Sequence, residues 1–341
     1  MKIPPVFGII DAYYFAKKSR RYCWVAVALW TTYFLAFGTL QAGTDPQMDA
    51  ATGFPREPLT LTEWKPGKKV AVCFVLYVEV WGFGHGPNFR PEMASRTPDL
   101  VNEAFRNYAI NFGLERTGGV FREEGVPLSI ALSALFPGQE PKVWKRFRAL
   151  LPKAPLLAHG MNNSTQMLPL GRGLAAQEKY VKATLDLIEK DTGVRSKGWS
   201  SPSVYGNIDT FRACAANGIA YTLDAMDSDF LSVLKTPEGK LLLIPYPPVP
   251  VDMGQFLGRN YKPRDMEQLW TDYVGELARE AEKNPEGPAT VIAIGIHPFV
   301  VGSPDGAAAM RRTLETLKKM PSVWLTDTEA LMQASGLDDP R

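Results

Sequence analysis

Five apolar segments of this sequence each end in polar or charged residues, and this repetition constrains the fold more than any other feature. The segments are VAVCFVLYVE ending on Glu79, PLLAH ending on His159, KGWSS ending on Trp199 and Ser200, IAYTLDAMDSD ending on an acidic run from Asp224, and TVIAIGIH ending on His297. Short apolar runs are typical of buried strands. In a barrel of parallel strands the C-terminal ends lie on one face, where such enzymes carry their catalytic groups. The pattern therefore predicts one shared site.

Helical patterns lie between these runs. Helices are expected over residues 101–124, 140–151 and 174–191, over a segment that Asp265 caps, and over a last segment that Thr326 and Glu329 begin as a capping box. Gly193 supplies a left-handed stop for the third helix. Strand, helix and strand repeated about seven times predict an α/β fold with parallel strands, either a barrel or an open doubly wound sheet. No G-x-G-x-x-G follows the first strand and there is no P-loop, which argues against a nucleotide-binding fold.

Composition narrows the function classes. The chain has 341 residues, of which 45% are hydrophobic and 22% are charged, so it is a globular protein able to bury a large core. Its formal net charge of +2, with no basic cluster interleaved with aromatics beyond the N-terminus, gives no nucleic-acid signature. Three cysteines without a C-x-x-C pair indicate neither a disulfide framework nor a zinc cluster. Oligomeric state is not indicated.

The N-terminal segment differs in composition from the rest of the chain. Four basic residues, Lys17, Lys18, Arg20 and Arg21, precede an uncharged segment from Tyr22 to Thr44. A basic flank before an apolar core predicts that residues 1–44 are a signal peptide or a membrane anchor. The folded part is then exported, periplasmic or membrane-anchored, with membrane contact only through this segment; the alternative is a cytoplasmic chain with an extended start. Residues 45–58, rich in proline, glycine and polar residues, are expected to form a linker before one domain over 59–341.

Ordered motifs along the domain carry a family resemblance. These are KKVAVCFVLYVEVW, RNYAINFGLERTGGVF, LLAHGMNNS, TGVRSKGWSSP, ACAANGIAYTLDAMDSD, LLLIPYP and IGIHPFVVGSP. Over about Leu59 to Gly336 the chain resembles the polysaccharide deacetylase superfamily, and most closely its allantoinase-like branch. The resemblance implies a distorted (β/α)7 barrel that hydrolyses a carbon–nitrogen bond other than a peptide bond. The implied substrates are N-acetylated carbohydrates or small cyclic amides.

The resemblance also implies a metal site whose usual ligands are incomplete here. The family's pair of strand-end aspartates is matched at Val75 and Leu76, with Glu79 as the nearest acid, and its two histidines four residues apart are matched by His159 and Asn163. Amide oxygens are poor ligands for zinc. No residue is therefore assigned as a metal ligand, and the resemblance implies that the branch includes members that work without a metal.

A zinc ion stays possible as a cofactor. Its ligands would be Glu79, His159 and one acid of the run that begins at Asp224.

Three residues are expected to be catalytic. His297 matches the family's late histidine, which is implied to protonate the leaving nitrogen, and a histidine titrates near neutrality. Glu79 could activate water if the pocket raises its pKa. Its rival is Asp224, where Asp227 and Asp229 would raise the pKa if they lie close. The structural alternative for His297 is a core histidine bonded to a backbone carbonyl.

The residues expected to bind substrate are His159, Asn163, Trp199, Ser201 and His85. His159 and Asn163 would hold the substrate carbonyl oxygen, or His159 would merely orient the loop. Trp199 matches a pocket-wall position and could stack on a sugar or ureide ring, whereas a buried tryptophan is more often core. Ser200 stands where deacetylases often have arginine. His85 lies in a long glycine- and proline-rich loop, residues 81–99, that could close over substrate.

Two functions from different classes follow. The first is a hydrolase of non-peptide carbon–nitrogen bonds, with the roles given above. The alternative is a noncatalytic, carbohydrate-binding relative of the deacetylases in which the mouth of the barrel survives without its chemistry. The presence of His297 favours the first.

Overall fold

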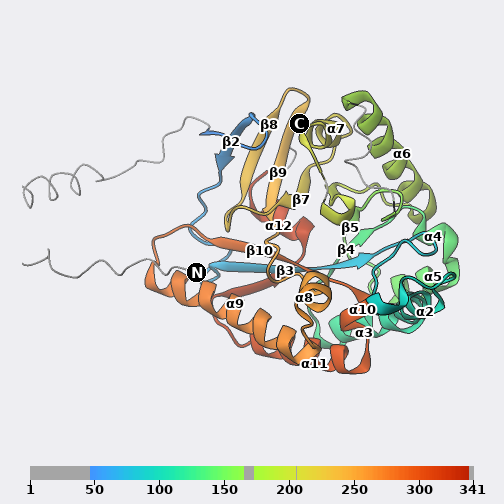
Figure 1. The fold of residues 1–341 in the computed structure, drawn as a ribbon. Helices are drawn as coiled ribbons and strands as arrows, with labels where there is room; N and C mark the ends of the chain where they lie inside the picture. The colour runs from blue at the N-terminus through green and yellow to red at the C-terminus, as the bar shows by residue number, and fades with distance from the viewer. Residues whose placement is uncertain (1–46, 165–172, 205, 338–341) are drawn as a thin grey trace, which may run out of the picture. The chain divides into compact units, whose positions relative to one another are not determined.

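The computed structural model describes residues 47–164, 173–204 and 206–337 (Figure 1). These residues belong to one compact unit that runs from Gln47. The predicted signal peptide or anchor at 1–44 lies outside the described residues, and export therefore stays a prediction. No helix within the described ranges is long and apolar enough to span a membrane.

Parallel strands form the centre of the domain. In spatial order they are β10 (Thr290–Ile296), β3 (Val70–Val78), β4 (Ser129–Leu132), β5 (Leu156–Ala158), β6 (Gly198–Trp199), β7 (Tyr221–Ala225) and β9 (Gly239–Pro245), and β11 (Val323–Thr326) pairs with the start of β3. The prediction of an α/β fold with about seven parallel strands is confirmed. No ladder joins β9 to β10 among the described strands, so strand pairing does not close the barrel at this point.

The N-terminal part of the domain differs from the predicted linker over 45–58. Strands β1 (Gln47–Met48) and β2 (Pro55–Pro58) are paired, and β2 continues the sheet antiparallel to β8 (Ser232–Thr236). In addition, the Arg56 Nε donates to Ser232 Oγ at 2.8 Å. Proline is tolerated in strands at sheet edges. The partner strand lies far away in the sequence, so local composition alone predicts a linker.

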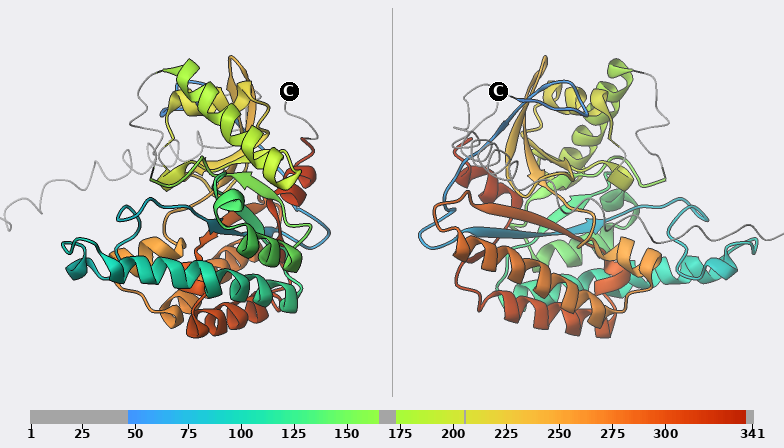
Figure 2. Two further views of the ribbon diagram at one scale, coloured as in Figure 1. Left: turned by 90° about the vertical axis from the view of Figure 1, so that its right-hand side faces the viewer. Right: turned by 60° about the vertical axis from the view of Figure 1, so that its left-hand side comes forward.

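Helices connect the strands and pack around them, as the two views of Figure 2 show. They are α2 (Leu100–Tyr108), α3 (Leu114–Glu124), α4 (Phe136–Gln139), α5 (Pro141–Leu150), α6 (Leu174–Thr192), α7 (Ile208–Ala216), α8 (Asp252–Arg259), α9 (Pro263–Lys283), α10 (Pro298–Val301), α11 (Pro304–Leu317) and α12 (Thr328–Ala334). The helices predicted over 101–124, 140–151 and 174–191 are confirmed. A π-helical turn, Ala109–Gly113, joins α2 to α3, and short 3-10 turns lie at Pro91–Met93 and Pro202–Val204.

The predicted helix ends are correct in part. Gly193 ends α6 in the left-handed conformation, with φ of 74°. Asp265 is the third residue of α9 rather than its N-cap, and its side chain accepts a hydrogen bond from the Lys262 backbone nitrogen at 2.8 Å. The predicted capping box from Thr326 is wrong, because Asp327 is the N-cap of α12 and accepts from the backbone nitrogen of Ala330.

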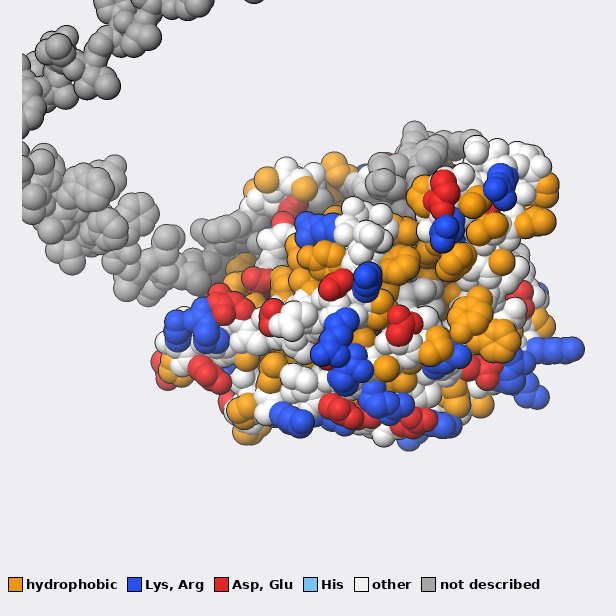
Figure 3. All heavy atoms as spheres, turned by 60° about the horizontal axis from the view of Figure 1, so that its bottom comes forward, with side chains coloured by type: hydrophobic (Ala, Val, Ile, Leu, Met, Phe, Trp, Pro, Cys, Tyr) orange, Lys and Arg blue, Asp and Glu red, His pale blue; other side chains and the backbone are white. Residues whose placement is uncertain are grey.

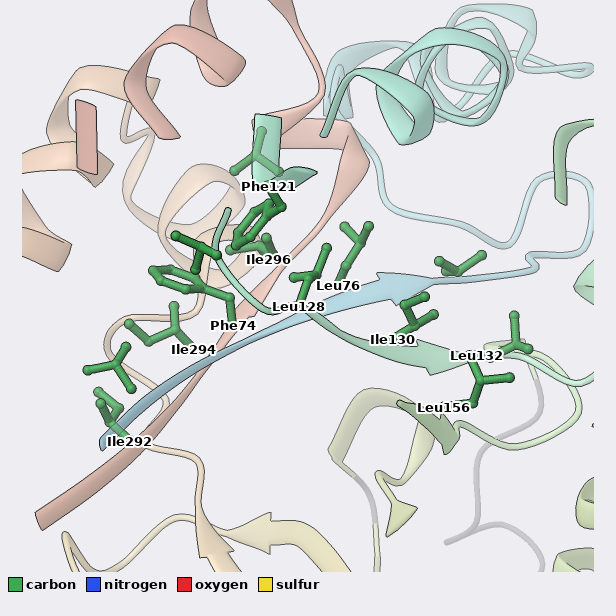
Figure 4. Packing of buried hydrophobic residues seen from close by; sticks show 14 of the residues in the cluster. Phe74, Leu76, Phe121, Leu128, Ile130, Leu132, Leu156, Ile292, Ile294 and Ile296 are labelled. Carbon is green, nitrogen blue, oxygen red and sulfur yellow. The ribbon is translucent and has the colours of Figure 1, made fainter. Parts of the chain in front are cut away.

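Strand β3 is buried on both faces, as parallel strands covered by helices require. Alternate residues such as Phe74 and Leu76 pack toward the helices with Phe121, Ile130 and Ile294 (Figure 4). The other set, which includes Val75 and Tyr77, packs inside the barrel. Glu79 follows Tyr77 on this second face, because side chains alternate along a strand. The strand therefore directs Glu79 to the mouth of the barrel.

Acidic and basic side chains are intermixed, among hydrophobic and uncharged ones, on the face shown in Figure 3. Arg312 on α11 pairs with Glu267 on α9 at 2.5 Å, and Arg311 pairs with Glu124 on α3 at 2.8 Å. Exposed pairs of this kind contribute little stability each.

Helix α3 approaches the end of α10 through two glycines. A Cβ added at Gly302 would overlap with Gly113 Cα and with the Pro298 carbonyl oxygen, whereas a Cβ added at Gly119 within α3 meets nothing within 4 Å. Gly302→Ala is expected to lower the free energy of unfolding by about 1–3 kcal/mol through overpacking. Gly119→Ala, the matched control, is expected to raise it by roughly 0.5–1 kcal/mol. Urea unfolding measures both, and an equal effect of the two changes would contradict this packing.

Candidate active site

Three of the predicted residues converge at the C-terminal ends of neighbouring strands. Glu79 follows β3, His159 follows β5 and His297 follows β10. Glu79 Oε1 lies 3.5 Å from His159 Nε2 and 3.8 Å from His297 Nε2. The exposed fractions of the three residues are 5%, 2% and 6%. A carboxylate and two imidazoles thus share one buried position at the mouth of the barrel.

His297 is held by Asp252, the first residue of α8. The His297 Nδ1 lies 2.6 Å from Asp252 Oδ1, and the His297 backbone nitrogen donates to Asp252 Oδ2 at 2.7 Å. A carboxylate only accepts hydrogen bonds, so the proton is on Nδ1 and Nε2 faces Glu79. Burial lowers the pKa of His297, but the charge and hydrogen bond of Asp252 and the charge of Glu79 outweigh burial, and its pKa is raised.

Glu79 is a well-bonded carboxylate. Its Oε1 accepts from Asn163 Nδ2 at 2.6 Å, and its Oε2 accepts from Trp81 Nε1 at 3.0 Å. Burial raises the pKa of Glu79, but its hydrogen bonds and the charge of His297 lower it below the usual value. A water-activating base would need a raised pKa, but the pocket lowers the pKa of Glu79 instead.

His159 and Asn163 contact each other as well as Glu79. The His159 Nδ1 lies 2.7 Å from the Ser200 carbonyl oxygen, so Nδ1 carries a proton and Nε2 is an acceptor. Asn163 Nδ2 lies 3.0 Å from this Nε2, and Ser133 Oγ donates to Asn163 Oδ1 at 2.9 Å. The amide of Asn163 thus directs its two hydrogens at Glu79 and His159, rather than at a position open to a substrate.

Tyr77 and Asp252 belong to this site but are absent from the residues predicted for it. The Tyr77 ring stacks on His297 at a centroid distance of 4.9 Å and an angle of 11°, and meets the His159 ring at 4.8 Å and 72°. Its Oη lies 3.1 Å from Ser200 Oγ, and burial raises the pKa of Tyr77. The spacing of Tyr77 two residues before Glu79 on one strand could have revealed it.

Comparison with solved structures now fixes the fold. No family model matches the sequence, and no curated protein sequence matches it. A Pseudomonas aeruginosa PAO1 protein described as a probable polysaccharide deacetylase is 20% identical with a TM-score of 0.69, over 82% of this chain and 95% of the other. This chain has the polysaccharide deacetylase fold. The allantoinase PuuE shares the fold at 23% identity, with a TM-score of 0.71 over 86% and 99% of the two chains. At these identities the likeness establishes the fold, whereas the reaction depends on the site.

The metal that the polysaccharide deacetylase fold implies does not fit the residues present. Among the residues that the structure describes, no group of three histidines, cysteines or acids could hold a metal ion. Glu79 and His159 lie side by side, but the amide of Asn163 bonds to both of them. Val75 and Leu76, matched to the family's aspartates, are fully buried within β3 and carry no ligand atom. No step of the proposed reaction is therefore assigned to a metal.

Asp224 lies beside this site, but both of its carboxylate oxygens already accept hydrogen bonds. It accepts from the Ser201 backbone nitrogen at 2.9 Å and from Ser201 Oγ at 2.6 Å. Burial raises the pKa of Asp224, whereas Asp227 pairs with Arg56 at 2.8 Å instead of acting on Asp224. Trp199 is fully buried in the core, and its Nε1 donates to Ser201 Oγ at 2.9 Å. Stacking of Trp199 on a substrate would require it to leave this position.

The long loop of residues 81–99 is anchored on helix α2. Arg106, itself buried, donates to the Pro87 carbonyl oxygen at 2.8 Å and pairs with Glu103 at 2.6 Å. His85 is exposed on this loop, and its backbone nitrogen donates to the Gly82 carbonyl oxygen. Closure of His85 over a substrate stays a prediction.

The raised pKa of His297 predicts a pH dependence of stability. A group whose pKa is raised on folding stabilises the folded state fully below its unfolded pKa, about 6.5 for histidine, and this contribution is lost as pH rises through the folded pKa. Urea unfolding of the wild type and of His297→Gln is compared at pH values from below 6.5 to above the folded pKa of His297. The difference between their free energies of unfolding is expected to shrink as pH rises. A difference that grows with pH would contradict the assigned charges of Asp252 and Glu79.

Proposed function

We propose that this chain hydrolyses a carbon–nitrogen bond other than a peptide bond, in an N-acetylated carbohydrate or a small cyclic amide. The observation that carries the proposal is the orientation of His297. Asp252 holds its Nδ1 proton, so that Nε2 faces Glu79 Oε1 at 3.8 Å in a buried position at the strand ends. The structures of a deacetylase-like protein and of an allantoinase that share this fold support the same class of bond.

Glu79 and His297 take complementary roles in the proposed reaction. Glu79 accepts a proton from water while the water oxygen bonds to the substrate carbonyl carbon. The carbon–nitrogen bond then breaks, and protonated His297 gives its Nε2 proton to the departing nitrogen. Protonation of His297 at neutral pH is favoured by its raised pKa.

The same pair restores the starting state. After the nitrogen leaves, Glu79 holds the proton taken from water and His297 lacks one. The separation of 3.8 Å between Oε1 and Nε2 is too long for a direct hydrogen bond, so one water molecule or a small movement returns the proton. Each cycle thus consumes one water molecule and breaks one carbon–nitrogen bond. His159 and Asn163 position Glu79, since Asn163 donates to it at 2.6 Å.

The low pKa of Glu79 sets a limit on this reaction. A carboxylate whose pKa is lowered is a weak base. General-base catalysis is most efficient when the base has a pKa near the working pH. A substrate that separates Glu79 from the charge of His297 would raise the pKa of Glu79. Binding of the substrate is therefore part of the activation of Glu79 in this proposal.

Product analysis tests the proposed function. The full chain is incubated with N-acetylglucosamine oligomers, with allantoin and with simple cyclic imides, and free acetate, released amine and ring-opened acid are measured. Turnover of an N-acetylated sugar assigns deacetylation, and ring opening assigns cyclic amide hydrolysis. Products that form equally in the Glu79→Gln variant would contradict the role of Glu79.

The second candidate is a noncatalytic carbohydrate-binding protein. Two observations favour it: Glu79, His159 and His297 are almost fully buried, and Glu79 has a lowered pKa. A binding protein would take up N-acetylglucosamine oligomers, seen by titration calorimetry, without any change in the oligomers over days. Binding without turnover on every substrate tried would favour this candidate over the hydrolase.

A further inference from the structure

Two lone pairs converge on one atom between β3 and β5. Glu79 Oε1 and His159 Nε2 both accept, and the atom they contact is Asn163 Nδ2, at 2.6 Å and 3.0 Å. His159 directs a lone pair here because its Nδ1 proton is engaged by the Ser200 carbonyl oxygen at 2.7 Å. A carboxylate and an unprotonated imidazole nitrogen that point at one position form a pair of cation ligands.

The separation of these two acceptors suits a divalent ion. Glu79 Oε1 and His159 Nε2 are 3.5 Å apart. Two oxygen or nitrogen ligands bound to a tetrahedral zinc at about 2.0–2.2 Å lie about 3.3–3.6 Å from each other. The acceptors therefore keep the spacing of two metal ligands although an amide nitrogen lies against both of them.

The orientation of Asn163 is fixed by its neighbours. Ser133 Oγ donates to Asn163 Oδ1 at 2.9 Å, and the Asn163 backbone nitrogen donates to the Val80 carbonyl oxygen at 2.8 Å. A flipped amide would place its oxygen against the carboxylate of Glu79 and against the lone pair of His159. Such a contact would join acceptor to acceptor, so the nitrogen is the atom that faces Glu79.

We propose that the side-chain amide of Asn163 takes the place of a divalent cation between Glu79 and His159, and that Asn163 is what keeps zinc from binding there. The amide supplies two polarised hydrogens where a metal would supply charge, and it contributes no further ligand. A carboxylate at position 163 would turn this donor into an acceptor, and Glu79, His159 and the new side chain would together form a three-ligand site. The proposal does not depend on hydrolysis, because its readout is metal binding.

The test compares zinc binding by the full chain in four forms: wild type, Asn163→Asp, Asn163→His, and Asn163→Asp combined with His159→Gln. Each protein is dialysed against zinc chloride and then against buffer, and bound zinc is measured by elemental analysis beside the midpoint of thermal unfolding. Asn163→Asp introduces a carboxylate beside Glu79 and is expected to lower Tm without metal. Zinc is expected to raise its Tm by several degrees, since a ligand that binds only the folded state stabilises it.

The expected result is no retained zinc in the wild type and one zinc per chain in Asn163→Asp or Asn163→His. The double variant, which lacks the His159 ligand, is expected to lose zinc and its effect on Tm. Asn163→His keeps the test decisive if Asn163→Asp fails to fold. One zinc per chain in the wild type that is lost in His159→Gln would overturn the proposal. It would equally be overturned if neither substitution at Asn163 gives zinc binding.

Discussion

Replacing His297 with glutamine is expected to lower kcat/KM by about 10²- to 10⁴-fold, the usual contribution of a positioned acid or base. Glutamine keeps a nitrogen donor that could reach Asp252 Oδ1, where His297 Nδ1 now lies at 2.6 Å. It cannot deliver a proton to the departing nitrogen. The ratio of kcat/KM between the wild type and His297→Gln, on a substrate that the wild type turns over, measures this effect.

The loss must come from chemistry rather than from unfolding. The near-ultraviolet circular dichroism of His297→Gln is expected to match that of the wild type, because Tyr77 and Asp252 keep their positions around residue 297. The alkaline limb of the wild-type pH profile, where His297 loses its proton, is also expected to disappear or move. A folded variant that retains wild-type kcat/KM would remove His297 from the mechanism.

Asp252→Ala is expected to lower the free energy of unfolding by about 3–5 kcal/mol, the cost of removing one partner of a buried ion pair. Asp252 is fully buried and accepts both from the ring and from the backbone nitrogen of His297. Without the carboxylate, a buried imidazolium has no charge partner on its Nδ1 side. Urea unfolding at a pH below the pKa of His297 measures the loss.

Asp252→Asn is the matched control, because it keeps the shape and one acceptor oxygen while removing the charge. Its free energy of unfolding is expected to lie between those of the wild type and Asp252→Ala. The pKa of His297, followed by NMR titration of its ring protons, is expected to fall in Asp252→Asn, since the charge of Asp252 raises it. An unchanged pKa in this variant would show that Asp252 does not set the charge of His297.

Local patterns were sufficient to predict the parallel strands and the convergence of their ends. Each strand-end polar residue lies directly after an apolar run, so the topology alone brings Glu79, His159 and His297 together. Helix α6 and its stop at Gly193 also follow from composition over a few turns. These features depend on neighbouring residues in the chain, which is why the sequence carries them.

Long-range pairing lies beyond such patterns. Asp252 follows a proline-rich stretch and gives no local sign that it meets His297, 45 positions later in the chain. Strand β2 looks like a linker because its antiparallel partner β8 is remote. The cap of α12 shifts by one residue because Asp327 competes with Thr326, and the side chain that reaches the Ala330 nitrogen is the N-cap.

The chemical state of the site also depends on contacts that no spacing reveals. Burial raises the pKa of Asp224 although its hydrogen bonds with Ser201 lower it, and Asp227 pairs with Arg56 instead of acting on Asp224. Asn163 was expected to face the substrate, but Ser133 orients its amide so that the nitrogen faces Glu79 and His159. Donor and acceptor directions are set by the three-dimensional neighbours of each group.

The most direct test of the proposed reaction is the kcat/KM of the wild-type chain before and after all divalent metal has been removed by a chelator. The proposed chemistry is carried out by Glu79 and His297, whose Oε1 and Nε2 face each other at 3.8 Å. We therefore expect a kcat/KM that is unchanged by chelation and not increased by added zinc. Activity that disappears with the chelator and returns with zinc would contradict the proposed reaction.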